Sequence, residues 1–126
     1  MTKKLLIDTD VFVDYLMGEQ RAKEFFEQLP EGTFHYSSLA KLELLSASVC
    51  SDPGVRNATV GLLSLGKKAE MDDSLIMTAA EIKRQHGLQL TDAVMAATAL
   101  QLKAELVTRN INDFKKIKEL LLMKPY

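Results

Sequence analysis

The stretch Leu5-Leu6-Ile7-Asp8-Thr9-Asp10-Val11-Phe12 decides how the rest of the chain is interpreted. An unbroken apolar run at its start is typical of a short strand buried on both faces, as in a parallel sheet. The run ends in two carboxylates, Asp8 and Asp10, which flank the hydroxyl of Thr9. In open α/β sheets, ligands bind in the crevice beyond the carboxyl ends of the strands. These acids therefore either cap the next helix or belong to a binding site.

Length and composition predict one domain spanning residues 1–126, because 126 residues, 47% hydrophobic and 26% charged, suit a single globular unit. The single cysteine, Cys50, excludes an internal disulfide framework and a thiolate metal cluster. The sequence has no basic-then-apolar leader and no apolar run of the roughly 20 residues that cross a bilayer. We therefore expect a cytoplasmic protein without a membrane segment.

The formal net charge of −1 does not indicate nucleic-acid binding, although carboxylates that hold a metal would mask a basic surface in that sum. Basic residues gather late in the chain, at Lys83, Arg84, Arg109, Lys115, Lys116 and Lys118. Such a run forms either a solvated face or a rim that faces phosphates.

Hydrophobic periodicity predicts strands that alternate with helices, which indicates an α/β fold around a mostly parallel sheet of four or five strands. We expect strands near residues 5–8, 33–36, 67–71, 105–108 and 120–123. Helices are expected at 11–16, 20–29, 38–50, 55–65, 75–86 and 92–103, with a helical turn at 114–118. The helix at 92–103 is apolar on nearly all faces, which predicts that it lies buried in the middle of the domain.

Three acids stand where a core element should not carry charge: Asp8 after the first strand, Glu43 on an apolar helix face, and Asp92 in the first turn of the alanine-rich helix. Asp8 and Asp92 are also explained as helix caps, and Glu43 as a solvent-facing side chain. Ionised carboxylates at low dielectric need a partner, and no buried lysine or arginine is evident as one. A divalent cation, Mg²⁺ or Mn²⁺, would suit hard oxygen ligands.

The loop after the strand at 105–108 adds polar groups to the same edge if that strand is parallel to the first. Asn110 or Asp113 would then provide a fourth oxygen donor. The alternative is a loop in which these side chains make local turns.

Four segments resemble the PIN-domain ribonucleases, most closely the VapC-type toxins of toxin–antitoxin pairs: 5–11 (LLIDTDV), 38–45 (SLAKLELL), 91–100 (TDAVMAATAL) and 106–114 (LVTRNINDF). The resemblance implies a three-layer PIN-like fold with Asp8, Glu43 and Asp92 as its acidic cluster. Asp8 and Asp92 would be the principal metal ligands, with Thr9 beside them. The family often has an acid where this chain has Asn110, a departure that would weaken a second metal site and for which Asp113 would compensate.

The resemblance further implies a metal-dependent endonuclease that cuts single-stranded RNA, forms a homodimer and is held inactive by a cognate antitoxin. We hypothesise that Asp8, Glu43, Asp92 and Asp113 are catalytic, and that the first three hold Mg²⁺ or Mn²⁺. The ion would polarise the scissile phosphate and lower the pKa of a bound water. Arg109, Lys115 and Lys116 would contact the RNA backbone as plain charges.

Three alternatives remain open. Asp8-Thr9-Asp10 resembles the start of haloacid-dehalogenase-type phosphatases, but the later lysine and paired acids of that class are not visible. A receiver-like signalling module needs an aspartate that ends a central strand, whereas Asp72 and Asp73 are predicted as helix caps. A PIN fold that binds RNA or acts as a scaffold, with little activity, is the third alternative.

Overall fold

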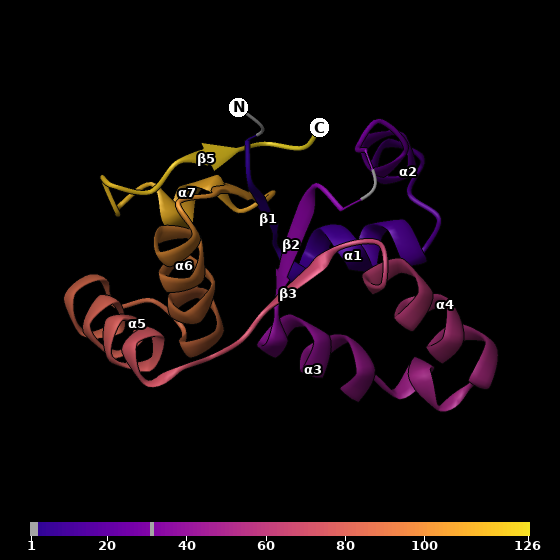
Figure 1. Ribbon diagram of the computed structural model, residues 1–126, viewed down its shortest axis with the longest axis horizontal. Coiled ribbons are helices and arrows are strands. Elements are labelled where there is room, and N and C mark those ends of the chain that lie inside the picture. The colour runs from indigo at the N-terminus through magenta and orange to yellow at the C-terminus, as the bar shows by residue number, and fades with distance from the viewer. Residues whose placement is uncertain (1–2, 31) are drawn as a thin grey trace.

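The computed structural model describes residues 3–30 and 32–126, which form one parallel sheet with helices on both faces (Figure 1). The strands are β1 (Leu5–Ile7), β2 (Phe34–Ser37), β3 (Lys67–Ala69), β4 (Glu105–Val107) and β5 (Leu122–Met123). The helices are α1 (Thr9–Leu16), α2 (Gln20–Glu27), α3 (Ser38–Ser46), α4 (Pro53–Leu63), α5 (Asp73–His86), α6 (Leu90–Leu102) and α7 (Ile111–Phe114), with a 3₁₀ turn, η1 (Ser48–Ser51). The strand order is β3-β2-β1-β4-β5, and all four pairings are parallel. The predicted three-layer α/β fold is therefore confirmed.

The central strand β1 explains why the fold has three layers. Successive side chains of a strand point to opposite faces, so Leu6 faces one side while Leu5 and Ile7 face the other. Leu6 packs into a core with α5 and α6, whereas Leu5 and Ile7 pack into a second core with α1, β2 and α4. All three are buried, as expected for a strand covered on both faces. Figure 1 shows α5 and α6 on one side of the sheet and α1, α2 and α4 on the other.

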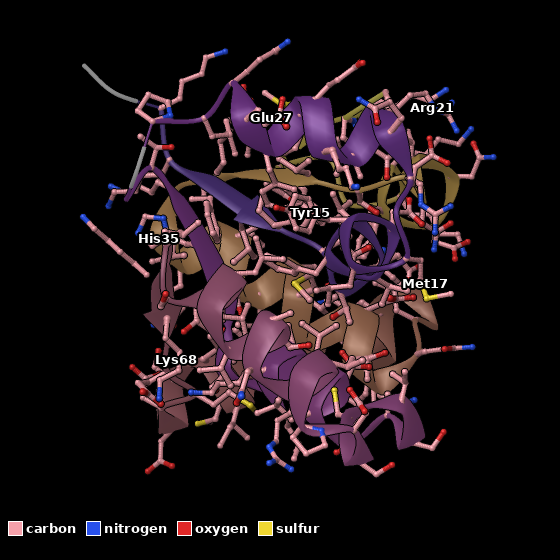
Figure 2. All side chains as sticks on the ribbon, turned by 90° about the vertical axis from the view of Figure 1, so that its right-hand side faces the viewer. Tyr15, Met17, Arg21, Glu27, His35 and Lys68 are labelled. Atoms are coloured by element: carbon pink, nitrogen blue, oxygen red, sulfur yellow. The ribbon has the colours of Figure 1, made fainter. Side chains whose placement is uncertain are left out.

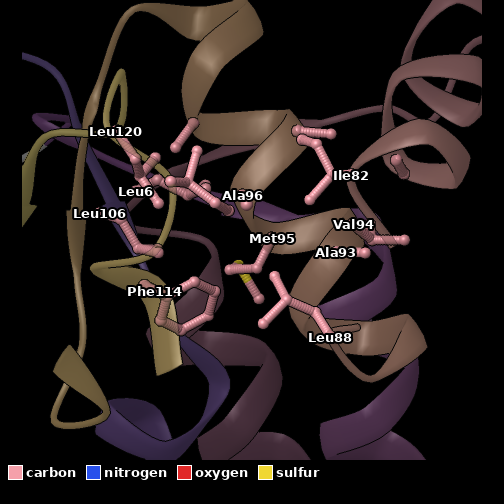
Figure 3. Close-up of a cluster of buried hydrophobic side chains, with 14 of the residues drawn as sticks. Leu6, Ile82, Leu88, Ala93, Val94, Met95, Ala96, Leu106, Phe114 and Leu120 are labelled. Carbon is pink, nitrogen blue, oxygen red and sulfur yellow. The ribbon is translucent and has the colours of Figure 1, made fainter. Parts of the chain in front are cut away.

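The first core is built around α6, whose residues 93–99 are all buried as the alanine-rich sequence predicted. Small side chains let neighbouring elements approach α6 closely, and Met95 fills the remaining space beside Leu6 and Phe114 (Figure 3). Phe114 is fully buried and closes the core at the end of α7. This packing fixes the start of α6 relative to the sheet, which is where Asp92 lies.

The second core contains most of the aromatic side chains. Phe12 on α1 stacks on Phe26 of α2, with ring centroids 5.5 Å apart, and meets Phe34 of β2 at 5.9 Å. Tyr15 of α1, labelled in Figure 2, meets the Phe26 ring of α2 edge-to-face, with ring centroids 5.3 Å apart. Offset and edge-to-face contacts are the favoured geometries for such pairs. They hold α1 against the sheet immediately after Asp8.

Local capping follows the sequence closely. Ser37 caps α3 and Asp72 caps α5, in each case by accepting a backbone N–H of the first turn. Gly87 ends α5 with a φ of 65°, a left-handed conformation that glycine adopts without steric cost. No helix in the described ranges, 3–30 and 32–126, is long and apolar enough to span a membrane.

Several boundaries differ from the predictions. The helix expected to run to Cys50 ends at Ser46, because Ala47 is extended and a 3₁₀ turn follows. The next helix begins at Pro53, earlier than expected, since Asp52 caps it and proline is tolerated in the first turn. The helical turn expected at 114–118 lies instead at Ile111–Phe114. This last shift brings Asp113 into a helix directly after the loop that carries Asn110.

We expect Phe12→Ala to destabilise the protein by about 3–5 kcal/mol, because it removes a fully buried ring and leaves a cavity. Val13→Ala, at the next position on the same helix but exposed, should change the free energy of unfolding by less than about 0.5 kcal/mol. Chemical denaturation of the two variants measures both values. Equal losses would show that α1 is not anchored through its aromatic face.

Candidate active site

The carboxyl ends of the parallel strands meet at a cavity of about 320 Å³ with an acidic wall. Its lining consists of Asp8, Asp10, Glu43, Asp92 and Asp113 together with Thr9, Gln89, Thr91, Met95 and Asn110. Asp8 and Asp10 follow β1, Glu43 comes from α3, Asp92 from α6, and Asp113 from α7. The fold therefore brings together the four acids hypothesised to be catalytic, and Asp10, which the sequence left as a helix cap or a site residue, lies with them.

Asp8 is the most buried of these acids, with 8% of its surface exposed. One carboxylate oxygen accepts the backbone N–H of Thr9 at 2.8 Å, and the other accepts the hydroxyl of Thr108 at 2.8 Å. Burial raises the pKa of Asp8 to about 6, and the nearby carboxylates of Asp10 and Asp92 add to this increase. Asp8 is thus both the N-cap of α1, as one interpretation of the sequence held, and the deepest acid of the cavity.

Glu43 is half-buried and is tied to the loop that carries Asp8. The hydroxyl of Thr9 donates to Oε1 of Glu43 at 2.9 Å. Ser37 is the last residue of β2 and the N-cap of α3, and β2 runs parallel to β1. The helix α3 therefore begins at the edge of the sheet where β1 also ends. Thr9 therefore links the two acids without neutralising either of them.

Asp92 lies in the first turn of α6 and is partly buried. Burial is the largest cause that raises its pKa, followed by the charges of Asp113, Asp10 and Glu43. The part of the cavity lining that belongs to residues 3–30 and 32–126 includes no lysine, arginine or histidine to offset these negative charges. A bound cation would relieve the repulsion between them.

The loop after β4 contributes a polar pair. Asn110 Nδ2 donates to Oδ2 of Asp113 at 2.6 Å, so the amide orients an acid at the cavity wall. Asp113 itself is exposed, whereas Asn110 is half-buried. The backbone N–H of Asn110 also donates to Thr108 Oγ1 at 2.9 Å, which connects this loop to Asp8.

The predicted RNA-contacting residues Arg109, Lys115 and Lys116 do not line the cavity. Arg109 pairs with Asp14 at 3.0 Å and lies 3.9 Å from Asp10, a lining residue. Lys115 and Lys116 follow α7 and are exposed.

Sequence reasoning missed one residue of the site, Thr108, which is fully buried and donates to Asp8. Asp10, which the sequence left as either a helix cap or a site residue, lines the cavity as a fifth carboxylate. Thr108 stands in a segment that the sequence had already selected. Thr108 ends a strand in the manner of Asp8, and this shared position is the signal that could have identified it.

The donor set suits Mg²⁺ or Mn²⁺, because every polar side chain that faces the cavity offers hard oxygen. Among residues 3–30 and 32–126, however, no three acidic, histidine or cysteine side chains are grouped closely enough to hold a metal ion directly. Mg²⁺ typically keeps several waters and takes only one or two carboxylates directly. An ion that kept several of its waters and took one or two of the lining carboxylates directly would fit both observations.

We expect the stability of the metal-free protein to depend on pH through Asp8. The pKa of Asp8 rises from 3.8 to about 6 on folding, so the folded state binds this proton more tightly and loses stability as the pH increases through that interval. The unsubstituted protein should therefore lose about 3 kcal/mol of unfolding free energy between about pH 3.5 and pH 7.5 that the Asp8→Asn variant does not lose. Denaturation at several pH values measures it.

A second substitution tests the hydrogen bond that holds Asp8. Thr108→Val removes the hydrogen bond that most lowers the Asp8 pKa, so this pKa should rise further in the variant. A titration of the Asp8 carboxyl carbon by NMR measures the change. A lower pKa in Thr108→Val would contradict the geometry described above.

Comparison with known proteins identifies the family. The family profile of the PIN domain matches residues 5–120. A chain of a toxin–antitoxin complex from Klebsiella pneumoniae is 25% identical, with a TM-score of 0.83 and 98% of each chain covered. A search of curated proteins gives no significant match.

Two further solved structures show the same fold. One is VapBC2 from Rickettsia felis bound to a promoter DNA fragment, at 23% identity and a TM-score of 0.79, covering 94% of this chain and 96% of that chain. The other is DNA-bound VapBC from Salmonella typhimurium, at 16% identity and a TM-score of 0.83, covering 98% and 99%. The predicted family is confirmed: this chain belongs to the PIN-domain family.

Proposed function

We propose that this protein is a divalent-metal-dependent endoribonuclease that hydrolyses phosphodiester bonds of single-stranded RNA. One observation carries the proposal: five carboxylates from four segments that are distant in sequence line one open cavity at the carboxyl edge of the sheet. Membership in the PIN-domain family and the similarity to toxin–antitoxin complexes support a nuclease. A cytoplasmic toxin is the corresponding biological role.

Asp8 and Asp92 are the proposed principal metal-binding residues, because the family resemblance implies them and both line the cavity from buried or half-buried positions. When bound, Mg²⁺ or Mn²⁺ would supply positive charge to the scissile phosphate and acidify a water molecule. Glu43, oriented by Thr9, and Asp113, oriented by Asn110, face the same space and would accept hydrogen bonds from ordered water. The protein's own contribution is to hold these oxygens in place before the substrate arrives.

The partners follow from the relatives. The matched structures are a toxin–antitoxin complex from Klebsiella pneumoniae and VapBC2 from Rickettsia felis. By analogy, we propose a cognate antitoxin as the partner of this chain, and a homodimer as its own assembly. Arg109, Lys115 and Lys116 are the proposed contacts to the RNA backbone.

The family match disfavours the phosphatase and receiver alternatives, both of which belong to other families. A PIN domain that binds RNA without cutting it remains the alternative that experiment must separate. The acidic cavity favours the enzyme, since a wall of carboxylates without a metal would repel the phosphate groups of RNA.

We expect the purified protein to cut single-stranded RNA in Mn²⁺ or Mg²⁺ and to stop when a chelator is added. Asp8→Asn should lower the cleavage rate by roughly 100-fold or more, because the metal contributes several kcal/mol to the transition state. Asp73→Asn, an exposed acid of α5 outside the cavity, is the matched control and should keep its activity. Gel analysis of a labelled oligonucleotide measures both. Full cleavage by Asp8→Asn would refute the assignment.

Metal binding has a readout that does not depend on activity. A ligand that binds only the folded state raises its stability, so Mn²⁺ should increase the melting temperature of the protein at about pH 7.5. The increase should shrink below about pH 6, because protons then compete for Asp8. Asp92→Asn should weaken the shift at both pH values. A shift that is unchanged at low pH would place the ion elsewhere.

A further inference from the structure

The guanidinium of Arg109 is held beside the cavity by two acids of α1. Its Nε lies 3.0 Å from Oδ2 of Asp14, and its Nη2 lies 3.9 Å from Oδ2 of Asp10. Asp10 and Asp14 are four residues apart, so both carboxylates lie on the same face of the helix. Asp10 lines the acidic cavity, as does Asn110, which follows Arg109 in the chain. Arg109 therefore lies at the rim of the cavity.

The contacts of Arg109 leave its outer edge available. The close contact to Asp14 uses Nε, whereas the contact of Nη2 to Asp10 is too long for a hydrogen bond. The side chain is 47% exposed. A guanidinium has five N–H donors in a fixed plane and can grip two phosphate oxygens at once. The ion pair through Nε limits how the guanidinium can turn, and with the described residues its terminal nitrogens form no hydrogen bond, so these donors are available to a ligand.

Asp14 is itself fixed from the other end of the chain. The hydroxyl of Tyr126, beyond β5, donates to the same Oδ2 of Asp14 that Arg109 contacts. Arg21, labelled on α2 in Figure 2, lies over the Tyr126 ring at 5.0 Å from its centroid and pairs with Glu19 at 3.0 Å. Burial and the contact with Asp14 raise the pKa of Tyr126, so its hydroxyl remains a donor at neutral pH.

We infer that Asp14 and Tyr126 are positioning residues that hold Arg109 for a phosphate of the RNA backbone next to the one that is cut. The inference rests on the proposed function and extends it to residues outside the cavity. Without the hydroxyl of Tyr126, the Asp14 carboxylate loses the hydrogen bond that fixes it, and Arg109 can turn away from Asp14 toward Asp10. The terminal nitrogens would then pair with an acid of the protein and not with the substrate.

Tyr126→Phe tests this with the loss of a single hydroxyl. We expect KM for a single-stranded RNA oligonucleotide to rise about threefold to tenfold with kcat unchanged, since a charged hydrogen bond is weakened in substrate binding and not in the chemical step. Asp14→Asn should act in the same direction. Tyr15→Phe removes a hydroxyl from the residue next to Asp14 and is the matched control with unchanged KM. Melting temperatures verify that all variants remain folded.

A double-mutant comparison separates positioning from a merely structural role. In Arg109→Ala, the further change Tyr126→Phe should have no additional effect on KM, because the residue that it positions is already absent. An equal rise in KM in both backgrounds would overturn the inference. Unchanged KM in Tyr126→Phe, with active protein, would overturn it as well and leave the proposed function intact.

Binding provides a readout without cleavage. In the Asp8→Asn background, fluorescence anisotropy of labelled RNA over a range of salt concentrations gives the number of phosphates neutralised. Arg109→Ala should reduce the slope of log K against log salt by about 0.7, the value for one phosphate of a single strand, and Tyr126→Phe should move it in the same direction. If the unsubstituted protein cuts no RNA but these slopes change, the nuclease proposal fails and the positioning role stands. If the protein neither binds nor cuts RNA, both fail.

Discussion

The carboxylate of Asp8, buried at the end of β1, is the constraint on which the rest of the site depends. Its two hydrogen bonds come from the backbone of α1 and from Thr108 at the end of β4, so one side chain joins the helix, the central strand and the neighbouring strand. A neutral residue could make similar contacts at less cost in desolvation. Burial raises the pKa of Asp8, so the folded protein loses stability when this carboxyl group is ionised at neutral pH.

The topology of the sheet explains how the other acids reach the same place. Parallel strands end at one edge, and each is followed by a loop or helix that begins there. Glu43 arrives on α3 after β2, and Asn110 and Asp113 arrive after β4. Asp92 is different, since it follows no strand directly and is placed by the packing of α6 against Leu6 and Phe114. Two cores on opposite faces of the sheet thus hold a single acidic cavity.

Charge is distributed in a way that suits a polyanionic ligand. The acids line the cavity, while the cations that could contact a nucleic acid, Arg109, Lys115 and Lys116, lie outside its lining. Within the part of the chain that the structure describes, Arg109 pairs with Asp14 and contacts Asp10, and it forms no ion pair with Asp8, Glu43 or Asp92. The deep acids therefore remain available to a metal ion, and the net charge of −1 conceals this separation.

The sequence by itself determined the α/β class, the buried alanine-rich helix and the acids Asp8, Glu43 and Asp92, because periodicity and the placement of charge next to apolar runs are local properties. Only the tertiary structure decided which other groups join them. Thr108 bonds Asp8 across 100 positions, and Tyr126 bonds Asp14 across 112. Hydrogen bonds between residues so far apart in the sequence produce no recognisable sequence pattern. They depend on the strand order and on how α1 packs against the sheet.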